Sequence, residues 1–94
     1  MSTDFRFAVN VGPKPGILDP QGRAVEGSLG HLGIEGVSAV RVGRRIELTV
    51  AAVDGATARA TVERLASELL SNPLIEAFSI EAIGAASSTV GAPA

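Results

Sequence analysis

Residues 37–50, VSAVRVGRRIELTV, decide which fold the rest of the chain can form. In the second half of this stretch, Arg45 to Val50, every second residue is apolar, which is the period of a strand with one buried face. The first half, Val37 to Val42, is also largely apolar, and Gly43 and Arg44 separate the two runs. Two strand-like runs joined by about two residues, one of them glycine, predict a β-hairpin.

Two further strands are predicted near the ends of the chain. Apolar residues occupy every second position from Phe5 to Val11 and again from Phe78 to Ala82. After them, GAASSTVGAPA has small residues, no charge and no period, which is typical of a disordered segment. We therefore expect a single domain over residues 1–83 and a disordered C-terminal tail over residues 84–94.

Two helices are predicted between these strands. Asp19 is a favoured N-cap and precedes a proline, so a helix is expected over residues 20–32, with Gly33 as its stop. Asp54 begins a second helix in the same way, and this helix ends near Asn72. Each helix has one apolar stripe, which predicts burial against a sheet. The stripes consist of Val25, Leu29 and Leu32 in the first helix and Ala58, Val62, Leu65, Ala66 and Leu69 in the second.

The element order β-α-β-β-α-β predicts an α+β fold. It is the order of a two-layer βαββαβ sandwich, ferredoxin-like or a close variant, with both helices on one face of a four-stranded sheet. A domain this small buries only a modest share of its surface on its own. In addition, the set of residues expected on the sheet face away from the helices is too apolar for a face fully exposed to water. We therefore expect self-association, as a dimer or higher, through that face or a strand edge. The set is Val37, Ala39, Thr49, Ile75, Ala77 and Ile83.

Composition excludes several classes of function. The chain of 94 residues has no cysteine, which excludes disulfides, thiolate nucleophiles and cysteine-ligated zinc. Its net charge of −2 gives no reason to expect nucleic acid. No apolar run approaches 18 residues and no targeting segment is evident, so we expect a soluble cytoplasmic protein without a membrane segment.

The search for chemistry finds no catalytic constellation. His31 is the only histidine, is expected to face solvent, and has no partner for general-base or metal chemistry. The carboxylates are dispersed over helix and strand surfaces. The loop Gly12 to Gly22 could hold a phosphate at a helix N-terminus, but its prolines lack amides and Asp19 would occupy the anion's place. We interpret this loop as a rigid corner.

Two sets of residues are candidates for partner contacts. Arg41, Arg44 and Arg45 flank the predicted hairpin turn, where they either grip a partner's carboxylates or only solubilise the tip. Gly27 and Gly30 project away from the buried stripe of the first helix. Either the helix tolerates them as poor helix formers, or another backbone comes close at these positions.

These residues carry a resemblance to the PurS family, the small subunits of bacterial and archaeal phosphoribosylformylglycinamidine synthase. The family's K-P-G-[VI]-L-D-P-[QE]-G motif falls on Lys14 to Gly22. Its G-[FIVY]-x-G-V-x-x-V-R-x-G-[KR] motif falls on Gly33 to Arg44, and its [LM]-L-x-N-P-[VL]-[IT]-E motif on Leu69 to Glu76. The match runs from Phe5 to about Glu81 with the motifs in register.

The resemblance implies a non-catalytic subunit of an ATP-dependent amidoligase complex (EC 6.3.5.3) that makes formylglycinamidine ribonucleotide in purine biosynthesis. A glutaminase subunit of the PurQ type would release ammonia, and a synthetase subunit of the PurL type would use ATP and Mg²⁺. This chain would bind no cofactor or metal; it would bridge the two subunits, assist ammonia transfer and work as a dimer. The candidate partner-contact residues are Lys14, Pro15, Gly16, Asp19, Arg23, Gly27, Gly30, Arg41, Arg44 and Arg45.

Two alternatives stay open at this point. The βαββαβ order is shared with small regulatory modules that bind amino acids at dimer interfaces, because a fold does not fix a function. The chain could also be a fragment of a larger synthetase that acts only as a scaffold.

Overall fold

The computed structural model describes residues 2–85, which form an α+β fold with two helices and three strands. The predicted tail lies outside the described residues from residue 86 onward, while Gly84 and Ala85 end the last strand. Within residues 2–85 no helix has the length and apolar character needed to cross a membrane. The elements are β1 (Thr3–Pro13), α1 (Pro20–Leu29) with the 3-10 turn η1 (Gly30–Leu32), β2 (Arg44–Ala52), α2 (Gly55–Leu65) with the π-helical turn η2 (Ala66–Leu70), and β3 (Glu76–Ala85).

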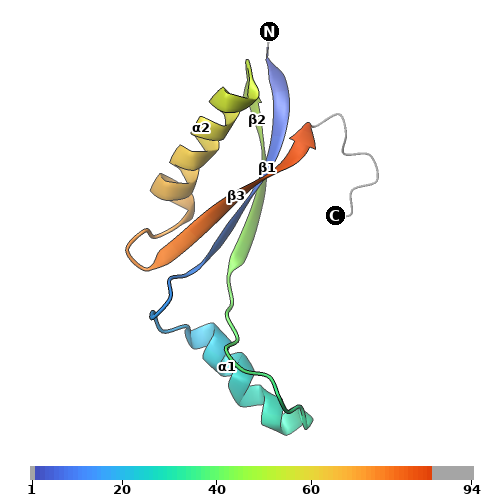
Figure 1. Cartoon of the computed structure of the whole chain (residues 1–94), viewed down its shortest axis with the longest axis vertical. Helices are drawn as coiled ribbons and strands as arrows, with labels where there is room; N and C mark the ends of the chain where they lie inside the picture. Colours follow the sequence, from blue (N-terminus) through green and yellow to red (C-terminus); the bar gives the residue numbers. More distant parts are fainter. Residues whose placement is uncertain (1, 86–94) are drawn as a thin grey trace.

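The three strands form an antiparallel sheet in the order β2-β1-β3, with α2 packed on one face (Figure 1). In this register Val9 of β1 lies opposite Ile46 of β2 and Ile80 of β3, so the alternating apolar residues of all three strands share the face that α2 covers. Val9 and Val62 are the largest fully buried side chains. The core is formed by Phe7, Val9, Val11, Ala52, Ala58, Val62 and Ala66.

The predicted hairpin at Gly43 and Arg44 is wrong, and the described sheet has three strands rather than four. Residues 37–43 form no strand with β2; they continue the line of β2 away from the sheet (Figure 1). The chain does not turn back because the segment is tied elsewhere: the Val42 amide donates to Asp19 and the Val40 amide to Glu26. These bonds join the segment to α1 instead of to β2.

The prediction that both helices cover one face of the sheet is also wrong. α1 begins after Asp19 and η1 ends at Gly33, as predicted, but α1 projects beyond the end of the sheet (Figure 1). The chain has a radius of gyration of 17.0 Å, whereas a compact domain of this size has about 12 Å. We call α1, η1 and the returning residues 34–43 the arm, and the sheet with α2 and η2 the body.

The face of the sheet opposite α2 is polar, which corrects the expectation of an apolar outward face. Ala8 at its centre is fully buried beneath ion pairs that link Arg45 to Glu47 and Glu81, and Arg6 to Glu47. Of the apolar set expected there, three members lie outside the strands. These are Val37 and Ala39, which belong to the arm, and Ile75, which belongs to the turn before β3.

Candidate partner interface

Asp19 lies in the loop between β1 and α1, and both of its carboxylate oxygens help to close the root of the arm. Oδ1 accepts from the Gly22 amide at 2.9 Å, which caps α1, and Oδ2 accepts from the Val42 amide at 2.8 Å. These two hydrogen bonds lower the pKa of the Asp19 carboxyl below its ordinary value. Asp19 is buried, and its two hydrogen bonds stiffen the root of the arm.

Three further contacts close the root of the arm. Glu26 Oε2 accepts from the Val40 amide at 3.0 Å, and an Nη of Arg41 donates to the Pro13 carbonyl at 2.7 Å and the Lys14 carbonyl at 3.0 Å. Gly22 allows the close approach, because a Cβ there would clash with the Val40 carbonyl oxygen. Gly22 therefore lets α1 pack closely against the returning segment.

A cleft of about 540 Å³ lies where the arm meets the body. Its charged side chains are already engaged: Arg44 forms an ion pair with Glu76, and Asp19 accepts from two backbone amides. Asp19 occupies the N-terminus of α1, where a phosphate would otherwise bind. The geometry therefore favours the rigid corner that the loop sequence predicts.

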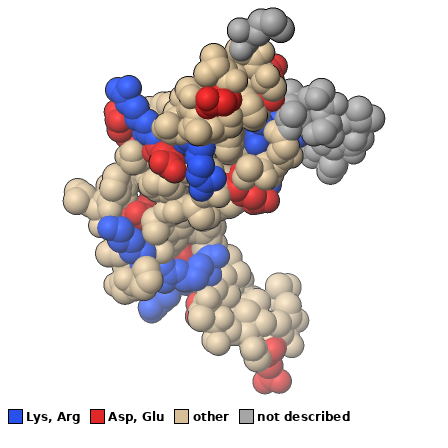
Figure 2. All heavy atoms as spheres, turned by 45° about the horizontal axis from the view of Figure 1, so that its top comes forward, with Lys and Arg blue, Asp and Glu red and all other residues tan. Residues whose placement is uncertain are grey.

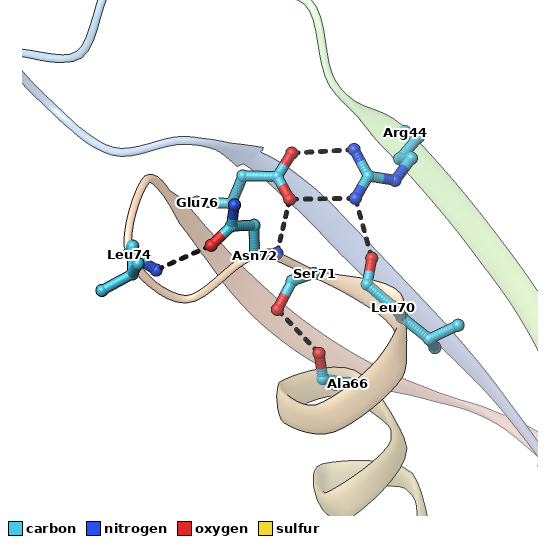
Figure 3. A network of polar contacts seen from close by, with 7 residues as sticks. All are labelled: Arg44, Ala66, Leu70, Ser71, Asn72, Leu74 and Glu76. Carbon is cyan, nitrogen blue, oxygen red and sulfur yellow. Dashed lines mark hydrogen bonds and ion pairs between the residues drawn. The ribbon is translucent and has the colours of Figure 1, made fainter.

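Arg44 organises the corner between β2, η2 and β3 (Figure 3). Its guanidinium forms a bidentate ion pair with Glu76, with N–O distances of 2.8 and 2.9 Å, and also donates to the Leu70 carbonyl at 2.8 Å. Glu76 in turn accepts from the Asn72 amide at 2.7 Å. The bond to Arg44, followed by that to Asn72, lowers the pKa of Glu76, and the same ion pair raises the pKa of Arg44.

Arg45 lies on the polar face of the sheet. It donates to Glu81 at 2.9 Å, to Glu47 at 3.1 Å and to Asn10 at 3.4 Å. The bonds to Glu81 and Glu47 raise the pKa of Arg45, and Arg45 lowers that of Glu81. The three arginines assigned to a hairpin tip therefore do not share a tip, and each is engaged within the chain.

The other candidate residues lie on or beside the arm. Within residues 2–85, Lys14 and Arg23 are the two cations without a carboxylate or carbonyl partner for their side chains. Pro15 and Gly16 form the exposed turn between β1 and α1, where Gly16 has a φ of +84°. Gly27 of α1 and Gly30 of η1 are exposed and have only open space where a side chain would be, so no contact within residues 2–85 requires a glycine at either position.

The sequence pattern missed the exposed apolar surface of the arm. Val25 is 44% exposed, Leu32 71%, Ile34 45% and Val37 48%, although the first two belong to the stripe that was expected to face the core. Figure 2 shows charged side chains interleaved over the body, whereas the distal arm is mainly uncharged. One signal was present: from Ala24 to Val40 the sequence has no lysine or arginine.

Within residues 2–85 the histidine and carboxylate side chains do not gather into a cluster. No three histidine, aspartate or glutamate side chains come close enough to hold a metal ion there. His31 lies exposed in η1, as the sequence predicts. The arrangement instead provides a surface for contact with a partner. It consists of the exposed apolar arm, its rigid root and the side chains of Lys14 and Arg23, which have no ion-pair partner within residues 2–85.

Comparison with known families gives a consistent result over nearly the whole chain. The PurS family model, described as phosphoribosylformylglycinamidine (FGAM) synthase, matches residues 6–84. The phosphoribosylformylglycinamidine synthase subunit PurS of Synechocystis is 42% identical over 81 residues, which cover 86% of this chain and 81% of the relative. The subunit of the same name from Mycobacterium leprae is 41% identical over 75 residues, covering 80% and 91%.

Solved structures agree with the sequence comparison. The crystal structure of the PurS subunit from Thermotoga maritima superposes with a TM-score of 0.80 at 29% identity, covering 88% of this chain and 95% of that one. A chain of the PurLQS structure from the same organism gives a TM-score of 0.78 at 30% identity, covering 85% and 98%.

Proposed function

This chain belongs to the PurS family of phosphoribosylformylglycinamidine synthase subunits, and from this membership we propose that it bridges the synthetase and glutaminase subunits of that enzyme. It is a subunit of FGAM synthase, which acts in purine biosynthesis. The bridging role is supported by its similarity to a chain of PurLQS, an assembly whose name includes PurL and PurQ beside PurS.

The enzyme would convert formylglycinamide ribonucleotide, glutamine, ATP and water into formylglycinamidine ribonucleotide, glutamate, ADP and phosphate. The glutaminase subunit would release ammonia and the synthetase subunit would consume it. Free ammonia is protonated and lost in water, so a subunit that holds two active sites in register and excludes solvent raises the yield without chemistry of its own. The observation that carries this proposal is the family match over residues 6–84.

The stiff root of the arm suits such a role. Asp19 and Arg41 order the corner before any partner arrives, through bonds to the Val42 amide and the Pro13 carbonyl. A surface ordered in advance loses less conformational entropy on docking. Lys14 and Arg23, which carry no ion pair within residues 2–85, are the charges there that a partner's carboxylates could meet.

We assign ATP and Mg²⁺ to the synthetase subunit and no cofactor to this chain. We also place the chain in the cytoplasm, where glutamine and ATP are available to the complex. Self-association belongs to the same proposal, because the apolar side chains of the arm are exposed in a single molecule. An exposed apolar patch of this kind marks an interaction surface. In the assembled state a fourth strand would complete the ferredoxin-like sheet that the element order predicts.

Reconstitution of the enzyme with and without this chain tests the bridging role. Without it, glutamine-dependent synthesis should be lost while much of the synthesis from added ammonium remains. Full glutamine-dependent synthesis in its absence would overturn the proposal. Isothermal titration of the isolated chain with glutamine and nucleotides is the control for the regulatory alternative, and we expect no heat of binding.

A further inference from the structure

Two short turns lie side by side at the end of the sheet from which the arm projects (Figure 1). One is residues 14–18, which follow β1, and the other is residues 72–76, which lead into β3. The Lys14 amide donates to the Ile75 carbonyl at 2.9 Å and so joins them. We call these two segments the paired turns, and they include none of the exposed apolar residues of the arm.

The turn before β3 is held by polar side chains (Figure 3). Asn72 Oδ1 accepts from the Leu74 amide at 3.2 Å, and the Asn72 carbonyl accepts from the amides of Ile75 and Glu76 at 3.0 and 2.7 Å. The Glu76 carboxylate accepts from the Asn72 amide, and its ion pair with Arg44 ties the turn to β2. The backbone of this turn is therefore fixed within the chain.

The turn after β1 is fixed in a similar way. Arg41 donates to the carbonyls of Pro13 and Lys14 at 2.7 and 3.0 Å, and the Ile17 amide donates to the Lys14 carbonyl at 3.1 Å. Asp19, directly after this turn, binds two backbone amides. Both turns thus have little conformational freedom left to lose in a complex.

These fixed turns present large apolar side chains to solvent. Leu74 is 84% exposed, Leu18 67% and Ile75 45%. Leu18 and Ile75 also line the cleft of about 540 Å³ beside the turns. An apolar side chain that protrudes from a rigid backbone is suited to fill a pocket on another protein. The chain has no tryptophan or tyrosine to serve as such an anchor.

The charge beside the paired turns is positive, although the whole chain has a net charge of −2. Apart from the ion pair already described, the cations Lys14, Arg23 and Arg41 lie near two carboxylates, Asp19 and Glu26. Both carboxylates already accept from backbone amides. A partner surface that fits therefore combines an apolar pocket with carboxylates at its rim.

We propose that the paired turns dock on a partner subunit of the enzyme, with Leu74 and Leu18 in an apolar pocket and carboxylates of that subunit beside Lys14. This inference rests on the proposed bridging role and names the surface that carries it. A protruding apolar side chain needs a concave partner, whereas small molecules bind in concave sites. An isologous contact would bring the same cationic surface against itself, which disfavours a second copy here.

Titration of this chain into the purified synthetase and glutaminase subunits tests the surface. The concentration that gives half-maximal glutamine-dependent synthesis is measured for the unmodified chain, Leu74→Ser, Leu18→Ser and the control Val53→Ser. Val53 is 69% exposed and follows β2 at the opposite end of the sheet. We expect a rise of at least about tenfold for each leucine variant and of less than about twofold for the control. All three side chains are exposed, so thermal unfolding should show intact folds.

The charge beside the anchor is tested with Lys14→Gln and Lys14→Arg. Added salt should raise the half-maximal concentration of the unmodified chain, because salt screens its attraction to carboxylates. This dependence should weaken in Lys14→Gln and persist in Lys14→Arg. Equal salt dependence in all three chains would overturn the contact of Lys14 with carboxylates.

The outcomes separate this surface from the bridging role. If the unmodified chain restores glutamine-dependent synthesis and the leucine variants match the control, the bridging role stands and the paired turns fail as its surface. If the unmodified chain does not restore synthesis, the bridging role itself fails. Sedimentation of the isolated chain and flotation with phosphatidylglycerol vesicles test other occupants. Self-association or vesicle binding that Leu74→Ser abolishes would overturn a partner subunit as the molecule that covers the turns.

Discussion

The two helices of this chain begin alike and end in different surroundings. Each follows an aspartate N-cap, Asp19 for α1 and Asp54 for α2, and each has an apolar stripe at helical spacing. Yet Val62 of α2 is fully buried, whereas Val25 of α1 is 44% exposed. The comparison teaches that helical periodicity reports an apolar face but does not say which molecule will cover it.

The body and the arm are also held by different forces. In the body, apolar burial against a hydrogen-bonded sheet provides the stability. In the arm, the Val40 amide donates to the Glu26 carboxylate and the Val42 amide to the Asp19 carboxylate. In a sheet, backbone carbonyls of a neighbouring strand would accept these bonds. The arm is therefore ordered by local hydrogen bonds but gains little stability from apolar burial. Its apolar side chains remain exposed and can contact another molecule.

The largest expected effect is in the body. Val62→Ala should reduce the free energy of unfolding by about 2 to 3 kcal/mol, because it leaves a cavity in a closely packed core. Val25→Ala in the arm should cost less than about 0.5 kcal/mol in the dissociated chain, and more at concentrations where the chain associates. Urea unfolding at several protein concentrations measures both, and equal costs for the two variants in dilute solution would contradict the distinction between arm and body.

A second comparison uses the two N-caps. Asp19→Ala removes the acceptors of both Gly22 and Val42, whereas Asp54→Ala removes only the cap bond to Thr57. Amides of α1 should then exchange about tenfold faster or more, as expected when a helix loses its cap. In Asp54→Ala the acceleration should be confined to the first turn of α2, and unchanged exchange of α1 in Asp19→Ala would show that Asp19 does not hold the arm.

The pH dependence of stability should distinguish the arm from the body. Hydrogen bonds lower the pKa of Asp19 in the arm and of Asp54 and Glu76 in the body, below ordinary values of 3.8 for aspartate and 4.5 for glutamate. A lowered folded pKa stabilises the fold above the ordinary value, and this contribution is lost as the pH falls through the folded value. Stability from these groups should therefore be constant above pH 4.5 and decline below it.

In Asp19→Asn the part of the acid-induced opening of the arm that comes from Asp19 should be lost, while the bond from the Val40 amide to Glu26 stays in place and the body keeps its own titration. NMR chemical shifts between pH 6 and pH 2 measure the two regions separately (pH limits chosen about two units to either side of the ordinary values). An arm that opens with the same acid titration in the variant would show that another group controls it.

The smallest expected effect concerns the glycines of α1. Gly27→Ala and Gly30→Ala should each stabilise the helix by about 0.5 to 1 kcal/mol, since a Cβ meets only open space at both positions. Both residues lie away from the apolar stripe, so the oligomeric state should not change. Thermal unfolding together with sedimentation decides this, and impaired assembly would instead identify a close backbone contact at these positions.

Much of the secondary structure could be predicted from the sequence, because its signals are local. Alternation gave β1 and β3, and the aspartate caps gave the starts of α1 and α2. The hairpin could not be judged in this way. A glycine such as Gly43 permits a turn but does not require one, and the bonds from Val40 and Val42 to side chains of α1 join residues far apart in the sequence.

The candidate interface was predictable only in part. Asp19 as the cap of α1 follows from cap and proline chemistry, and this cap is confirmed. The partners of Arg44 and Arg45 depend on the pairing of strands, which the residue pattern does not specify. Exposure of the arm depends on which molecule covers it in an assembly, and the sequence shows only that residues 24–40 lack lysine and arginine.

Sedimentation equilibrium of the isolated chain at micromolar concentrations tests most directly whether the arm is completed by a second molecule. The account predicts a mass of two chains or a multiple of two, falling toward one chain when Val25 and Leu32 are replaced by glutamate. A single chain at every concentration in that range would contradict it.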